Sequence, residues 1–108
     1  MNYNIIAVPK FKRELKKLAK RFSSLKSDFS ALLGHLQQNP QQGILLGNHC
    51  YKIRMAVTSK GKGKSGGARV ITYLQPCEST LYLLSIYDKS NKENVSDKEL
   101  KELLEPLS

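Results

Sequence analysis

Residues 51–75 read YKIRMAVTSKGKGKSGGARVITYLQ, and here the spacing of the apolar residues changes from helical to strand-like. Apolar residues alternate with polar or small ones over residues 51–58, a period of two that predicts a half-buried strand. Residues 59–67 are mostly glycine, lysine and serine, which predicts a flexible loop. Residues 68–75 return as a second strand, which ends at Pro76. The segment therefore predicts a β-hairpin with a basic, glycine-rich loop.

Two helices are predicted before this hairpin. A β-prone segment at residues 3–8 stops at Pro9, which suits the first turn of a helix because its missing N–H is not needed there. Apolar residues then recur at helical spacing, with basic residues on the opposite face. A second apolar stripe follows Ser23 and Ser24, either of which can cap a helix, and stops at Asn39-Pro40. The short connection predicts an antiparallel helical hairpin.

One strand and one helix are predicted after the hairpin. Residues 81–87 read LYLLSIY, which is apolar enough for a strand inside the sheet. Ser96 and Glu99 fit a capping box, and the leucines that follow predict a short terminal helix with an acidic outer face. The chain has 108 residues, enough for one domain over residues 1–108. These elements predict an α+β fold.

Acidic residues are missing from the centre of the chain. No aspartate or glutamate occurs in residues 29–77, and residues 1–77 carry 14 basic and 2 acidic residues. Residues 78–108 carry 4 basic and 7 acidic residues. Six cations lie in the acid-free stretch: Lys52, Arg54, Lys60, Lys62, Lys64 and Arg69. Such a field favours a polyanion as partner, and nucleic-acid phosphate is the expected one.

Three of these cations are predicted to share one face of the sheet. Lys52 and Arg54 are two residues apart on a strand, and pairing with the next strand lets Arg69 reach the same face. Without a partner acid they repel each other unless an anion binds, so they predict an anion site.

A second set of residues is predicted to contact RNA. The loop cations are either a mobile finger on a nucleic-acid backbone or a solubilising hairpin tip. A tyrosine on a strand either packs in the sheet or meets a base or phosphate. The candidates for RNA or ribosome binding are Lys60, Lys62, Lys64, Tyr73 and the cations of the first helix, Lys12, Arg13, Lys16 and Lys17.

Several other sites are excluded. Gly63-Lys64-Ser65 is similar to the end of a phosphate-binding P-loop, but the required first glycine is Thr58, and a strand follows instead of a helix. His35 and His49 have no carboxylates or paired cysteines nearby, so no metal site and no cofactor are predicted.

The cysteines, the N-terminus and the apolar runs together indicate the cellular compartment. Cys50 and Cys77 form no CxxC pair, the N-terminus does not have the pattern of a signal peptide, and no apolar run reaches membrane-spanning length. Free thiols in a reducing cytoplasm are expected, with the cysteines serving as small apolar side chains.

Nearly the whole chain resembles the RelE/ParE superfamily of bacterial type II toxins, most closely its RelE and HigB-like branch. The matching segments are the basic first helix, Asn39-Pro-Gln-Gln-Gly43, Tyr51-Lys-Ile-Arg54, Ser65-Gly-Gly-Ala-Arg-Val-Ile-Thr-Tyr73 and Leu83-Leu-Ser-Ile-Tyr-Asp-Lys89. The resemblance implies a small antiparallel sheet, with the helical hairpin on one side and a mobile C-terminal helix.

The resemblance also implies a function. Such toxins are ribosome-dependent endoribonucleases that cut mRNA in the ribosomal A site and are silenced by a cognate antitoxin. The family's basic catalytic positions fall on Lys52, Arg54, Arg69 and Lys89. RelE also uses a tyrosine near the start of the terminal helix, where this sequence has Val95, and Tyr87 is the candidate substitute.

Two other functions stay open at this point. One is a ParE-like inhibitor of DNA gyrase, which has the same fold and no RNase activity. The other is an RNA-binding module without catalysis, against which stands the lack of an aromatic RNA-binding signature.

Overall fold

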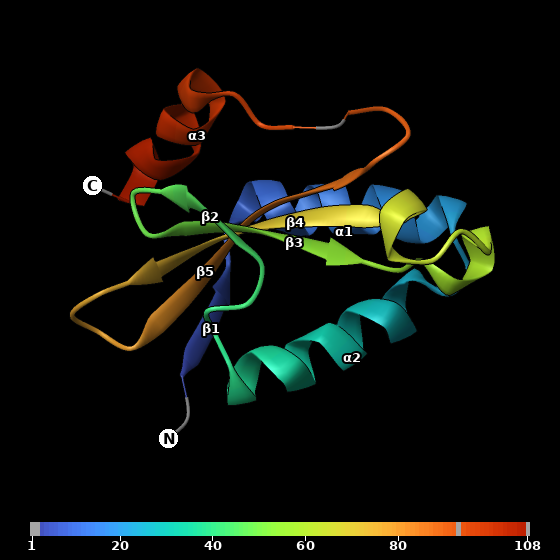
Figure 1. Ribbon diagram of the computed structural model, residues 1–108, viewed down its shortest axis with the longest axis horizontal. Helices are drawn as coiled ribbons and strands as arrows, with labels where there is room; N and C mark the ends of the chain where they lie inside the picture. Colours follow the sequence, from blue (N-terminus) through green and yellow to red (C-terminus); the bar gives the residue numbers. More distant parts are fainter. Residues whose placement is uncertain (1–2, 93, 108) are drawn as a thin grey trace.

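The structure, a computed structural model, describes residues 3–92 and 94–107 (Figure 1). It contains one five-stranded sheet with the strand order β1-β5-β4-β3-β2. The strands are β1 (Asn4–Ala7), β2 (Ile44–Gly47), β3 (Cys50–Met55), β4 (Ala68–Gln75) and β5 (Thr80–Asp88). The helices are α1 (Pro9–Arg21), α2 (Leu25–Gln38) and α3 (Asp97–Leu104). The predicted α+β class, both early helices and the terminal helix are confirmed.

The sheet differs from the expected one in two ways. It is mixed, because β1 pairs in parallel with β5 while the other neighbours are antiparallel. It also contains β2, which was not predicted. This strand has four residues, follows Gly43 and ends at Gly47, and the φ angles of these glycines are +97° and +100°. So short a strand shows no periodic pattern, and pairing direction between distant strands leaves no mark in either one.

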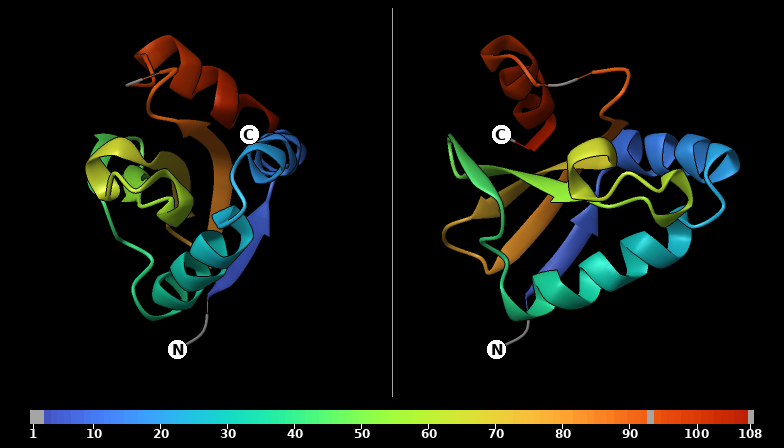
Figure 2. Two further views of the ribbon diagram at one scale, coloured as in Figure 1. Left: turned by 90° about the vertical axis from the view of Figure 1, so that its right-hand side faces the viewer. Right: turned by 45° about the vertical axis from the view of Figure 1, so that its right-hand side comes forward.

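The sheet separates two apolar layers (Figures 1 and 2). On one face, α1 and α2 bury Phe11, Leu25 and Leu36 against strand residues such as Val70 and Leu83. On the other face, α3 packs through Leu100 on a second cluster that includes Ile71, Leu84 and Cys50. The predicted capping box starts α3, since Ser96 Oγ accepts from Glu99 N at 3.1 Å and Glu99 Oε1 accepts from Ser96 N at 3.2 Å.

The single acid of α1 seals an open edge of the sheet. β1 covers β5 only as far as Leu83, so the amides beyond it have no strand partner on that side. Glu14 Oε1 accepts hydrogen bonds from Ser85 Oγ at 2.8 Å and from Ile86 N at 3.3 Å. The carboxylate therefore satisfies part of the edge that β1 leaves bare.

The cysteines behave as small apolar or surface residues. Cys50 is buried and Cys77 is exposed, and both thiols are free. Burial raises the pKa of the Cys50 thiol to about 11, so it stays protonated at neutral pH. None of the described helices is long and apolar enough to cross a membrane.

Gly67→Ala is expected to destabilise the protein by about 1–3 kcal/mol, because overpacking against backbone is not easily relieved. A Cβ at Gly67 would lie 2.1 Å from the Met55 carbonyl oxygen and 3.0 Å from Ala56 Cα. Urea unfolding followed by circular dichroism measures the change.

Gly34→Ala is the matched control. A Cβ at Gly34 meets nothing within 4 Å, and the position lies inside α2. Alanine there is expected to stabilise the protein by about 0.5–1 kcal/mol. Equal stability of the two variants would contradict the packing described for Gly67.

Candidate functional site

Strand register brings two arginines opposite each other. Arg54 on β3 and Arg69 on β4 are direct partners, and Arg69 is in turn opposite Tyr87 on β5. Side chains alternate along a strand, so Arg69 and Ile71 point to the same face of the sheet. Ile71 packs in the apolar cluster that α3 covers through Leu100, called here the α3 cluster. Arg54, Arg69 and Lys52 therefore point to the face that carries α3. The expectation that Arg69 reaches the face of the other two is confirmed.

Arg69 is fixed by main-chain oxygens. Its side chain is buried, the residue being 5 % exposed. Nη1 donates to the carbonyl oxygens of Lys64 at 3.0 Å and Ala68 at 3.1 Å, and Nη2 donates to that of Ser65 at 3.1 Å. Carbonyl oxygens orient the guanidinium and leave its charge un-neutralised. Arg54, by contrast, is exposed. The pair thus combines a buried, hydrogen-bonded cation, Arg69, with an exposed one, Arg54.

The two lysines of the predicted catalytic set lie at the border of this face. Lys52 Nζ donates to Asn94 Oδ1 at 2.8 Å, so the segment between β5 and α3 passes close to it. Lys89 follows the end of β5, and its amide donates to the Gly67 carbonyl oxygen at 3.1 Å. An amide oxygen satisfies Lys52 without cancelling its charge.

Tyr87 lies between the arginine pair and α3. The residue is 8 % exposed and packs in the α3 cluster, and Lys92 Nζ lies 5.5 Å from the centre of its ring. Burial raises the pKa of the phenol, an effect that the charge of Arg69 partly offsets. The hydroxyl is therefore protonated at neutral pH and is a proton donor.

Lys60 was predicted to be one of the mobile loop cations, but its side chain is buried in an ion pair. Its side chain is 8 % exposed, and Nζ lies 2.6 Å from Asp88 Oδ1. No sequence pattern indicates this pairing, because Asp88 lies outside the acid-free stretch and meets Lys60 only in the folded chain. Lys62 and Lys64 are exposed, as expected.

The loop predicted to be flexible also contains regular secondary structure. It contains two 3-10 turns, η1 (Thr58–Lys60) and η2 (Lys64–Gly66). The first turn replaces the end of the predicted strand over residues 51–58, because Thr58 N donates to Asp28 Oδ2 at 3.0 Å and Thr58 Oγ1 to Asp28 Oδ1 at 2.7 Å.

The remaining predicted RNA-binding residues lie elsewhere. Tyr73 stacks on Tyr82 with ring centres 6.1 Å apart and packs against the α3 cluster, while the residue stays partly exposed. Its contact with RNA stays a prediction. The predicted α1 cations, Lys12, Arg13, Lys16 and Lys17, are exposed. Since α1 packs on the opposite face of the sheet, the structure does not bring them together with the arginine pair.

A hollow of about 220 Å³ adjoins Arg54. Arg54 and Lys64 line it together with His35 and Gln42 of the α2 side. Sequence reasoning considered His35 only as a metal ligand and missed this neighbourhood. Within the described residues, no group of three or more His, Cys, Asp or Glu side chains could hold a metal ion.

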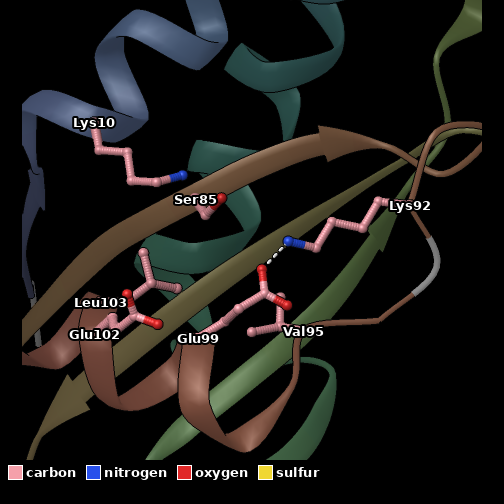
Figure 3. Close-up of a pocket in the computed structure, with 7 residues that line it drawn as sticks. All are labelled: Lys10, Ser85, Lys92, Val95, Glu99, Glu102 and Leu103. Carbon is pink, nitrogen blue, oxygen red and sulfur yellow. Dashed lines mark hydrogen bonds and ion pairs between the residues drawn. The ribbon is translucent and has the colours of Figure 1, made fainter.

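A second cavity, of about 210 Å³, lies between the start of α1, β5 and α3 (Figure 3). Glu99 and Glu102 line it, and Lys92 pairs with Glu99 across it. Val95 also lines it. Lys10 and Lys92 line the same cavity, so its two carboxylates are matched by two ammonium groups and it offers a phosphate no net positive charge. Among the described residues, the arginine pair has no carboxylate oxygen within 4 Å, and it is the candidate site.

Comparison with known proteins defines the class. The fold is similar to that of free E. coli toxin RelE, in a mutant form, with a TM-score of 0.63, 17% identity and 100% of both chains covered. It is similar to the intact E. coli RelBE toxin-antitoxin complex with a TM-score of 0.61 and 18% identity, over 80% of this chain and 95% of the other. For the Mycobacterium tuberculosis RelBE2 complex the TM-score is 0.59 and the identity 16%, over 82% and 99%.

These likenesses establish a RelE-like fold. The sequence itself matches the family described as the RelE toxin of the RelE / RelB toxin-antitoxin system over residues 10–106. The chain belongs to the RelE toxin family.

Asp88→Asn is expected to lower stability at neutral pH and to lose its effect in acid. Burial by itself raises the pKa of Asp88, but hydrogen bonds from Lys60 and Ser90 and the charge of Lys60 lower it below its ordinary value. A carboxyl with a lowered folded-state pKa contributes stability above its unfolded pKa, about 3.9, and loses it as pH falls through the folded pKa. The free energy of unfolding from urea titrations at pH 2–7 measures the difference.

The control is Asp97→Asn, which removes a carboxylate from the exposed first turn of α3. Its effect at neutral pH is expected to be much smaller. If the difference in free energy of unfolding between wild type and Asp88→Asn stays constant down to pH 2, the result contradicts a stabilising ion pair.

Proposed function

We propose that the protein is a toxin that cleaves mRNA on the ribosome. The observation that carries this proposal is the pairing of Arg54 with Arg69 on one sheet face. Among the described residues, neither arginine nor Lys52 has a carboxylate oxygen within 4 Å of its charged nitrogens. Cations held together without an acid leave their field for a polyanion such as RNA.

The chemistry that suits this site is attack within the RNA. The ribose 2′-oxygen forms a bond to the adjacent phosphorus, the bond from phosphorus to the 5′-oxygen breaks, and a 2′,3′-cyclic phosphate and a 5′-hydroxyl result. Charge builds on the phosphate oxygens in the transition state. Arg54 is open to them, and Arg69 adds a fixed charge whose orientation is set before substrate arrives.

Two proton transfers complete the reaction. The 2′-hydroxyl loses its proton, and the proposed acceptor is Lys52 or Lys89, which can take the proton only as the neutral amine. The departing 5′-oxygen gains a proton, and Tyr87 is the proposed donor because its phenol is protonated at neutral pH. Tyr87 would thus take over the part that the family's tyrosine plays where this chain has Val95.

The exposed cations other than the arginine pair suit contact with the ribosome. Lys62 and Lys64 lie on the loop beside the pair, and the exposed α1 cations form a second basic surface on the other side of the sheet. Two basic surfaces suit a protein held between ribosomal RNA and mRNA. A ribosomal substrate implies a cytoplasmic protein.

An antitoxin is the proposed protein partner, as in the RelBE complexes of E. coli and M. tuberculosis. An acidic segment over Lys62, Lys64 and Arg54, or one that displaces α3, would cancel the field that RNA needs. A purified complex that still cleaves mRNA at the free toxin's rate would exclude this mode of control.

Induction in cells separates the proposal from its alternatives. A ribosome-dependent endonuclease stops protein synthesis first and produces new mRNA 5′ ends within translated codons. A gyrase inhibitor stops DNA replication first, and a module that only binds RNA produces no new ends. Either of the latter results would overturn the proposal.

Arg54→Ala is expected to slow mRNA cleavage by roughly a hundred- to a thousandfold, the usual effect of removing one fixed donor from a developing oxyanion. Arg69→Ala is expected to do the same. Single-turnover cleavage on programmed ribosomes measures the rate.

The matched control is Lys98→Ala, which removes the same charge from an exposed site on α3. Cleavage by this variant should stay within a fewfold of wild type. Undiminished cutting by Arg54→Ala and Arg69→Ala would remove both arginines from the proposed mechanism.

Tyr87→Phe is expected to lower the cleavage rate by about a hundredfold or more while leaving ribosome binding intact, because it removes only the proton donor. Rate and binding are measured by single-turnover cleavage and by co-sedimentation with ribosomes. Tyr73→Phe is the control, since Tyr73 is placed in the α3 packing. Equal rates for the two variants would assign the proton to another group.

A further inference from the structure

Lys60 and Asp88 form an ion pair that the proposed reaction does not use. Lys60 Nζ lies 2.6 Å from Asp88 Oδ1, and the two side chains are 8% and 3% exposed. The ammonium also donates to Ser90 Oγ at 3.1 Å and lies 5.4 Å from the centre of the Phe22 ring. Taking two charges out of water costs free energy that their attraction largely offsets, so such a pair is a poor source of net stability. Its main effect is on the arrangement of the elements that it joins.

The pair joins the glycine-rich loop to the end of the central strands. Lys60 is the last residue of η1, and Asp88 is the last residue of β5. The other side of the same turn is held to α2, where Ser24 Oγ accepts from Ser59 N at 2.8 Å and Asp28 accepts from Thr58. The first turn of the loop is therefore fixed from two directions, by α2 and by β5.

The second turn of the loop holds Arg69. Only residues 61–63 separate η1 from η2, whose Lys64 and Ser65 carbonyl oxygens accept from the Arg69 guanidinium. The loop then leads into β4, and its last residue, Gly67, accepts at its carbonyl oxygen from the amide of Lys89, which follows β5. A displacement of η1 would move these carbonyls and release the guanidinium.

We propose that Lys60 and Asp88 are positioning residues, whose ion pair holds the glycine-rich loop so that its carbonyl oxygens keep the Arg69 guanidinium in one orientation. The catalytic consequence rests on the proposed function, whereas the mechanical link between the ion pair and Arg69 does not. The link can therefore be tested without any assay of cleavage.

The first experiment follows the guanidinium N–H signals of Arg69 by NMR of ¹⁵N-labelled protein. The signals are assigned by their loss in Arg69→Lys. Hydrogen-bonded N–H groups exchange slowly with water, and Lys60→Met is expected to speed their exchange by roughly tenfold or more. Lys62→Met removes the same charge from an exposed position two residues away and should leave the exchange unchanged.

Two further variants keep this test decisive. Asp88→Asn retains an oxygen for hydrogen bonding and removes the charge, so it should also speed exchange, and it decides the matter if Lys60→Met does not fold. Lys60→Arg retains the charge and should restore slow exchange at least in part. Unchanged Arg69 signals in folded Lys60→Met and Asp88→Asn would overturn the proposal.

The second experiment measures cleavage. Lys60→Met is expected to lower kcat by about a hundredfold with KM little changed, because a small misplacement of a catalytic group has that effect. In an Arg69→Met background it should lower kcat no further, since it acts through Arg69. Losses that multiply would show that Lys60 acts independently of Arg69. If wild type does not cleave, the proposed function fails and the NMR result still stands.

Discussion

Three main-chain carbonyl oxygens hold the guanidinium of Arg69 in place. Those of Lys64, Ser65 and Ala68 accept from the Arg69 guanidinium, and a carboxylate in their place would have cancelled its field. Orienting a cation with neutral acceptors is possible only if a segment of main chain is brought close to it and kept there. The glycine-rich loop supplies that segment, and Gly67 permits the approach, because a Cβ there would meet Met55 of β3.

Both acids of residues 1–77, and Asp88 at the end of β5, are used for structure. Glu14 satisfies the edge of β5, Asp28 holds the start of the loop, and Asp88 holds Lys60. Each of these carboxylates is engaged by donors on another element and is therefore withheld from the face with Arg54 and Arg69. The field of that face depends as much on where the acids are bound as on where the cations lie.

The local sequence pattern was enough to predict most of the helices and strands. Helical periodicity and the capping box predicted all three helices. Strand alternation predicted β3 but extended it to residue 58, whereas the strand ends at Met55, and β4 and β5 were predicted within one residue of their observed bounds. β2 and the parallel pairing of β1 were missed, since neither depends on a pattern within one segment. For the site, spacing of two residues predicted a shared face for Lys52 and Arg54. The partners of Lys60 and Arg69 could not be predicted, because Asp88 and the loop carbonyls reach them only in the folded chain.

The hold on Arg69 comes from main-chain atoms, and this has an evolutionary consequence. Lys64 and Ser65 contribute their carbonyl oxygens to Arg69, while both residues are exposed. Their side chains can be exchanged without altering the oxygens that orient the guanidinium. Mutation can therefore tune how strongly the loop attracts a polyanion while the geometry around Arg69 is inherited unchanged. Affinity for a polyanion and the geometry around Arg69, which share one short loop, are free to diverge separately among descendants of this chain.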